Sequence, residues 1–175
     1  MTKAYQIVVS LSICLIFFGH TCMGGEKEIL KTSTLFEKLL QASNYTPDSS
    51  HKTLYTNSYR KSLQEFREKQ SRGVSSRQLL EHLFYKVHRQ YLKTYQPFQG
   101  FSDIFKSGEY GCLTGTALYS LFLSDLGFQH DIVETTYHVF IIIEADGNKF
   151  AFEATDAIDG FIDGTQSVEN KLADL

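Results

Sequence analysis

The chain is predicted to fold as an α+β domain in which helices come first and strands follow. Apolar residues recur at helical spacing through residues 26–126, and three short stretches rich in β-branched and aromatic residues follow between residues 131 and 154. Helices followed by strands are typical of an antiparallel sheet packed against helices. The 175 residues, 42% of them hydrophobic, suffice for one core of ordinary size.

Residues 25–175 are expected to form this single domain, with a helical part over residues 26–106. Glu26–Ala42 and Tyr59–Gln70 carry apolar residues at helical spacing, which predicts two helices. The polar stretch Ser43–Thr56 between them contains Pro47 and predicts a loop.

Ser76–Tyr95 is predicted to be the third helix. Ser75 or Ser76 can cap its N-terminus, and Pro97 and Gly100 follow its end. Its apolar residues form one stripe, made of Leu79, Leu80, Leu83, Phe84, Val87 and Tyr91.

A central helix over Gly111–Leu126 is predicted to open the core of the domain, residues 108–161. Gly108 breaks the chain before it, and Gly127 is a suitable C-terminal cap. The aromatic segment Phe98–Phe105 is expected to pack beneath this helix or to line a groove beside Cys112.

Three strands are predicted after the central helix: Asp131–Thr135, Tyr137–Glu144 and Lys149–Ala154. Asp146-Gly147 between the last two is a strong signal for a two-residue hairpin turn. The sequence therefore predicts a small antiparallel sheet on which the cysteine-bearing helix packs.

The hairpin turn fixes a register. If Asp146 and Gly147 are the turn residues, Phe140 lies opposite Glu153, and His138 becomes a diagonal neighbour of Glu153 on the same face. A glutamate can reach an imidazole ring across that separation, whereas a slip of one residue would place the two side chains on opposite faces. We expect the helix that carries Cys112 to pack on this face with its N-terminus toward His138.

The first 24 residues are expected to be an export signal that is removed. A short basic start at Met1-Thr2-Lys3 precedes the apolar stretch Ile7–Phe18, and small residues follow. The stretch is shorter than the roughly 20 residues that a membrane-spanning helix needs. The mature protein is therefore expected in the periplasm or the extracellular space.

Cys22 leaves two outcomes of cleavage open. A cut after Gly24 removes both Cys14 and Cys22 and releases an exported protein. If Cys22 is instead the acceptor of a bacterial lipoprotein signal, a lipid anchors the mature N-terminus, and this anchor is the only membrane contact expected. His20 departs from the small residues usual before such a cysteine, and a metazoan secretory route also remains open.

With Cys14 and Cys22 removed or Cys22 lipidated, Cys112 is the cysteine that keeps a free thiol, so it has no disulfide partner within the fold. A helix N-terminus favours the reactive thiolate. Gly111, Thr114 and Gly115 surround the sulfur with small groups that leave room for a substrate. A free cysteine can also be a small buried hydrophobe, but these neighbours favour a nucleophile.

Cys112, His138 and Glu153 follow one another in the order of a nucleophile, its base and the group that orients the base. The two partners of Cys112 also have plain structural interpretations. His138 can be a core histidine bonded to a carbonyl, and Glu153 can be a solvated strand residue. Their combination on suitable elements favours a catalytic triad.

Five short segments within Glu109–Phe161 resemble the transglutaminase-like superfamily, the bacterial branch of the papain-like cysteine peptidase fold. They are Tyr110-Gly111-Cys112-Leu113-Thr114-Gly115-Thr116-Ala117-Leu118-Tyr119, Leu126-Gly127, Tyr137-His138-Val139-Phe140, Glu153-Ala154-Thr155-Asp156 and Gly160-Phe161. The resemblance implies that Cys112 is the nucleophile and His138 the base. Glu153 becomes the third member, since Glu-Ala-Thr stands where the family usually has Asp-Pro-Thr, and Asp156 is the alternative.

With such a triad, the thiolate attacks an amide or ester carbonyl of a peptide or protein substrate. Cell-surface material is one possible source of this substrate. No cofactor is needed. The backbone amide of Cys112 and a second donor among Tyr110, Gln99 and Gln96 are expected to hold the oxyanion. Water as the acceptor gives a peptidase or amidase, which we favour, and an amine gives a transglutaminase-like acyltransferase. The alternative is a binding or interaction module of the same fold without turnover.

Other functions have little support. The net charge of −3 gives no reason to expect nucleic-acid binding. His82 and His88 fall on different faces of one helix and lack further ligands, and His130 has no obvious partner, so no metal site is expected. The polar segment Gly160–Leu175 shows no clear closing strand, and the sequence leaves open whether more chain follows.

Overall fold

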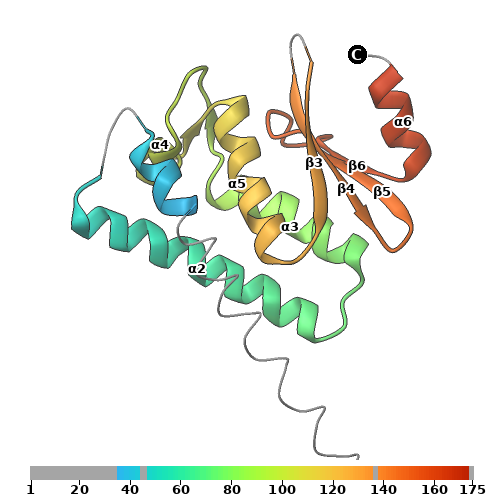
Figure 1. Ribbon diagram of the computed structural model, residues 1–175, viewed down its shortest axis with the longest axis horizontal. Helices are drawn as coiled ribbons and strands as arrows, with labels where there is room; N and C mark the ends of the chain where they lie inside the picture. The colour runs from blue at the N-terminus through green and yellow to red at the C-terminus, as the bar shows by residue number, and fades with distance from the viewer. Residues whose placement is uncertain (1–34, 44–46, 136–137, 174–175) are drawn as a thin grey trace, which may run out of the picture.

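The computed structural model describes residues 35–43, 47–135 and 138–173. Its architecture is α+β, as the sequence predicts, with most helices on one side of a four-stranded antiparallel sheet (Figure 1). A helical segment at residues 35–41 comes first. The further elements are α2 (Ser49–Ser71), α3 (Ser76–Gln90), β1 (Thr94–Tyr95), α4 (Phe101–Lys106), β2 (Glu109–Tyr110), α5 (Cys112–Asp125), β3 (Gln129–Glu134), β4 (Val139–Ala145), β5 (Asn148–Phe152), β6 (Phe161–Asp163) and α6 (Thr165–Ala173).

Helix α2 begins well before the predicted start at Tyr59, so the expected loop over Ser43–Thr56 is wrong for its second half. The cause is Asp48, whose carboxylate accepts hydrogen bonds from the backbone of Ser50 at 3.0 Å and of His51 at 2.9 Å. An aspartate at this position satisfies the free N–H groups of a helix start.

Helix α3 begins at the predicted cap but ends at Gln90, short of the predicted Tyr95. Residues 94–95 instead form β1, which pairs in parallel with β2 just before Cys112. This pairing holds the end of the long helical segment against the start of α5.

The β4–β5 hairpin has the predicted register. Ala145 pairs with Asn148 and Ile141 pairs with Phe152. Asp146 and Gly147 have φ values of 52° and 75°, the left-handed conformation that a two-residue hairpin turn requires. Strand β6 and helix α6 extend the structure beyond the three strands that the sequence predicts.

Helix α5 is the central element of the core. The ring of its Tyr119 stacks on Phe84 of α3 at 5.5 Å and meets Phe152 of β5 edge-on at 5.1 Å. Its hydroxyl donates to the carbonyl oxygen of Phe84 at 2.9 Å. The sheet lies between α5 and α6, and α6 covers the opposite face with the buried Val168 (Figure 1).

The first turn of α5 packs closely on the end of β5. A Cβ atom added to Gly115 would lie 2.9 Å from Cβ of Ala154 and 3.1 Å from Cδ2 of Tyr110. Only glycine allows this approach, which brings the helix turn that follows Cys112 against the residue that follows Glu153.

Gly115→Ala should therefore destabilise the protein, although alanine favours a helix over glycine by about 1 kcal/mol. We expect a loss of about 1 to 3 kcal/mol in the free energy of unfolding, measured by urea denaturation, because the added methyl group overfills the contact. Adding Ala154→Gly removes the opposing methyl group and should recover part of the loss. Equal or greater stability of Gly115→Ala alone would contradict the close contact.

Candidate active site

Cys112 is the first residue of α5, and the helix start leaves backbone donors free. The residue before it, Gly111, has no side chain to cap the helix, and the first intrahelical bond runs from the Gly115 N–H to the Gly111 carbonyl oxygen at 2.9 Å. The hydroxyl of Thr114 accepts from the N–H of Gly111 at 2.9 Å, which fixes the turn. The N–H groups of the first helical turn are thus directed toward the space before the helix, where the helix dipole favours negative charge.

The loop between β1 and α4 lies against the residue that precedes Cys112. A Cβ atom added to Gly111 would lie 3.5 Å from both the Gln96 carbonyl oxygen and the Phe98 nitrogen, and 3.8 Å from the Gln99 nitrogen. The side chain of Phe98 is 97% exposed, and its φ is 67°. A large aromatic side chain in this conformation is uncommon and marks the loop as a candidate substrate-binding element.

His138 and Glu153 form the pair that the hairpin register predicts. Nδ1 of His138 lies 3.1 Å from Oε1 of Glu153. A proton on Nδ1 is the state in which the ring can donate to this carboxylate, and it leaves Nε2 as the acceptor. The backbone of His138 is held by Thr135, whose N–H donates to the His138 carbonyl oxygen at 2.8 Å.

Glu153 is buried, with 8% of its surface exposed, and a backbone hydrogen bond fixes its position. Its N–H donates to the carbonyl oxygen of Gly160 at 2.8 Å. Only a glycine fits at residue 160, because an added Cβ atom would lie 2.4 Å from the Glu153 carbonyl oxygen. The second carboxylate oxygen, Oε2, lies 3.0 Å from Nζ of Lys171 on α6, a partner that sequence reasoning missed.

The three candidate residues come from elements that meet at one end of the sheet. His138 directly precedes β4, and Glu153 directly follows β5. The N-terminal end of α5 lies at the same end of the sheet, consistent with the contact between Gly115 and Ala154 (Figure 1).

The approach of α5 differs from the expected one, in which the helix packs on the face that carries the pair. Ala154 contacts α5, whereas Glu153 contacts Lys171 of α6 on the other side, since neighbouring residues of a strand point to opposite faces. Helix α5 therefore packs on the face of the sheet opposite to the one that carries the pair. The Cys112 sulfur makes no hydrogen bond with any residue that the structure describes.

Asp156, the alternative third member, has another role. Its carboxylate accepts from the backbone N–H groups of Asp159 at 2.8 Å and Ile158 at 3.0 Å. The hydrogen bond from Asp159 is the main cause that lowers the pKa of Asp156. Asp156 thus shapes the turn after Glu153, and the His138 ring contacts Glu153 instead.

The three candidate oxyanion donors differ in placement. Tyr110 is buried, packs its ring against His88 and Tyr95, and has its pKa raised by burial. Near Gly111, Gln96 places its carbonyl oxygen, which cannot donate, whereas Gln99 places its backbone nitrogen. Of the three, Gln99 is therefore the one that brings a backbone nitrogen close to the residue before Cys112.

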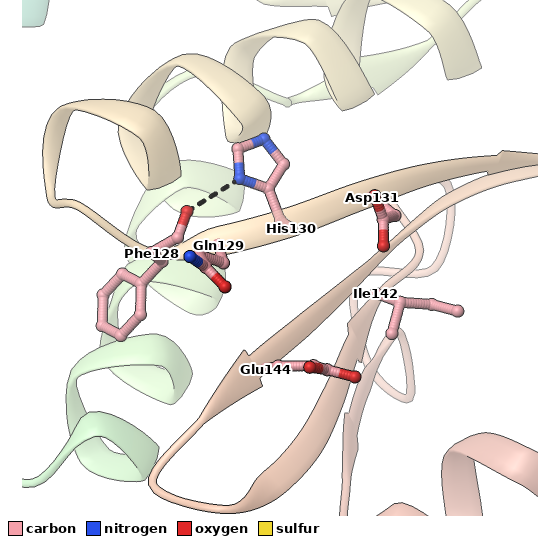
Figure 2. Close-up of a pocket in the computed structure, with 6 residues that line it drawn as sticks. All are labelled: Phe128, Gln129, His130, Asp131, Ile142 and Glu144. Carbon is pink, nitrogen blue, oxygen red and sulfur yellow. Dashed lines mark hydrogen bonds between the residues drawn. The ribbon is translucent and has the colours of Figure 1, made fainter.

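His130 lies beside a shallow hollow of about 420 Å³ between β3 and β4 (Figure 2). Its Nδ1 donates to the carbonyl oxygen of Phe128 at 3.0 Å, and its Nε2 lies 2.7 Å from the hydroxyl of Ser120. Both ring nitrogens are engaged, so this histidine joins α5 to β3 and is not free to bind a ligand. Among the described residues, no group of His, Cys, Asp and Glu side chains is arranged to hold a metal ion.

His88 is more buried than an ordinary surface histidine. It is 5% exposed among the rings of Phe84, Tyr110 and Tyr119, and neither ring nitrogen has a hydrogen-bond partner in the described part of the chain. Burial lowers its pKa, and the backbone of Leu92 and the charge of Asp156 oppose this shift only in part.

His88 should therefore make stability depend on pH. The unfolded chain binds a proton at the ordinary pKa of 6.5, above that of the folded protein, so the free energy of unfolding should fall as pH drops below 6.5. His88→Phe should lose less stability between about pH 7 and pH 5 in urea denaturation. Identical pH slopes for the two proteins would show that His88 does not carry this effect.

Comparison with protein-family models, with curated proteins and with solved structures finds no match to this chain. No helix in the described ranges is long and apolar enough to cross a membrane. The expected signal over residues 1–24 and the lipidation candidate Cys22 lie outside the described residues. The contact of His138 with Glu153, at the end of the sheet where α5 begins, is the basis for the proposed function.

Proposed function

We propose that this protein is a transglutaminase-like cysteine acyl-transfer enzyme that hydrolyses an amide or peptide bond. The observation that carries the proposal is the contact of 3.1 Å between His138 Nδ1 and Glu153 Oε1, at the end of the sheet where the Cys112 helix begins. A buried carboxylate in contact with an imidazole, at the end of the sheet where a cysteine begins a helix, supports the arrangement that activates a thiol.

The chemistry proceeds in two steps. Nε2 of His138 takes the proton from the Cys112 thiol, and the sulfur bonds to the carbonyl carbon of the substrate. The negative oxygen is held by the N–H of Cys112 and the backbone N–H of Gln99. The leaving amine takes the proton from His138, which produces a thioester. A water molecule then gives a proton to His138 and attacks the thioester, which releases the carboxylic acid and restores the thiol.

Two exposed apolar residues, one directly after Cys112 and one in the loop that lies against Gly111, support a substrate with an apolar group near the scissile bond. Phe98 is 97% exposed and Leu113, directly after Cys112, is 64% exposed. Apolar side chains held beside a reactive group provide a binding surface for a peptide. The expected export signal places such a substrate, a peptide or a protein, outside the cytoplasm.

A binding module of the same fold is the second candidate function. The observation that favours it is the Cys112 sulfur, which makes no hydrogen bond with any described residue. In that case, the surface around Phe98 and Leu113 binds a partner without turnover.

The reactivity of Cys112 toward iodoacetamide separates the two candidates. At pH 6.5, only about one hundredth of a thiol with the ordinary pKa of about 8.5 is ionised. If His138 stabilises the thiolate, alkylation followed by mass spectrometry should remain fast at this pH, and His138→Ala should slow it about tenfold or more.

His51→Ala is the matched control for this experiment. The ring of His51 also contacts a carboxylate, Asp48 Oδ1 at 3.0 Å, but at the start of α2. Its removal should leave alkylation unchanged. Equal rates for the His138→Ala variant and the unmodified protein across the pH range would refute the thiol–imidazole pair.

Glu153→Gln and Asp156→Asn separate the two candidate acids. Glu153→Gln should reduce the rate of alkylation near neutral pH about tenfold or more, because the amide no longer stabilises an imidazolium ring. Asp156→Asn should keep most of the rate and show a lower melting temperature, since it weakens the turn at Asp159. The opposite ranking of the two rates would make Asp156 the third member.

A further inference from the structure

The C-terminal helix α6 brings a cation to the acid of the proposed triad. Lys171 Nζ lies 3.0 Å from Glu153 Oε2, and His138 Nδ1 lies 3.1 Å from the other oxygen, Oε1. The Glu153 side chain is 10% exposed and that of Lys171 is 40% exposed. A carboxylate with a separate charged or polar partner on each oxygen has one favoured orientation.

We propose that Lys171 is a positioning residue that holds the Glu153 carboxylate against the His138 ring and thereby selects one tautomer of that ring. The catalytic meaning of this role rests on the proposed function. The positioning itself concerns three side chains whose contacts can be measured without any substrate.

The placement of Lys171 is part of the fold. Helix α6 begins where the Asn148 side chain accepts from the Thr165 N–H at 3.0 Å, and Val168 then packs into the sheet. Lys171 follows Val168 by three residues, so it lies on the same face of the helix, toward the sheet. The helix that covers β5 thus presents its lysine at the end of that strand.

Other charged groups near this carboxylate have different contacts. Asp156 is influenced by the charge of Lys171, but its oxygens accept from backbone N–H groups. Lys149 of β5 lies 3.9 Å from Glu169 of α6. Within the described residues, Lys171 is therefore the cation other than His138 that contacts Glu153.

The physical effect of Lys171 is on the neutral imidazole. While Oε1 faces the ring, Nδ1 keeps the proton and Nε2 remains the base. Without Lys171, Oε2 lacks its partner, and the long hydrogen bond of 3.3 Å from the Thr155 hydroxyl to Oε1 is a weaker hold, so the carboxylate can turn away from the ring toward water. The ring then populates both tautomers, and the fraction with Nε2 free to accept a proton falls.

The test is ¹⁵N NMR of the full chain labelled in histidine, at a pH where His138 is neutral, with His138→Gln used to assign the ring signals. The unmodified protein and Lys171→Arg should show mainly the Nδ1–H form, and Lys171→Met should show a mixture of both forms. Lys149→Met is the matched control, because it removes a lysine from the same face, and it should leave the ring unchanged.

A double variant tests whether the effect passes through the carboxylate. In a Glu153→Gln background, adding Lys171→Met should not change the tautomer ratio further. The proposal is overturned if Lys171→Met has the ring signals of the unmodified protein, if Lys171→Arg resembles Lys171→Met, or if Lys171→Met has the same effect with and without Glu153.

A second readout separates this inference from the proposed function. If both hold, Lys171→Met should slow alkylation of Cys112 near neutral pH about threefold to tenfold, less than Glu153→Gln does. If the tautomer ratio changes while alkylation of Cys112 does not depend on His138 at all, the positioning role stands and the acyl-transfer function fails.

Discussion

The register of the β4–β5 hairpin is the constraint on which the candidate site depends. The turn at Asp146-Gly147 has the left-handed backbone that fixes which residues lie opposite one another. A shift of one residue would move Glu153 to the face of α5 and separate it from both His138 and Lys171. One turn therefore determines the partners of a carboxylate that lies at the other end of the hairpin.

The site is assembled from both sides of the sheet. Helix α5 packs against the end of the sheet from one side, because Gly115 has no side chain. Helix α6 contacts Glu153 from the other side through Lys171. The start of α5, which carries the thiol, thus lies on the first side, and the imidazole–carboxylate pair and its lysine lie on the second. Each group of the candidate site is therefore positioned by a different element of the fold.

The sequence was sufficient for those parts of the structure that local patterns control. Alternation and the Asp-Gly turn predicted the hairpin and the contact of His138 with Glu153, and helical spacing predicted α5. It was not sufficient for α6, because a short polar segment such as Thr165–Ala173 becomes helical only by docking on a sheet, and Lys171 was missed with it. The early start of α2 had a readable signal, the capping Asp48. The side from which α5 approaches depends on tertiary packing alone.

The proposed function requires that the Cys112 sulfur and the His138 ring meet at the end of the sheet. A crystal structure of the protein alkylated at Cys112 with iodoacetamide tests it most directly. We expect Nε2 of His138 to lie within hydrogen-bond distance of the sulfur or the attached amide group, and the amide oxygen to point to the N–H groups that begin α5. An adduct directed away from the ring, with other side chains between sulfur and imidazole, would contradict it.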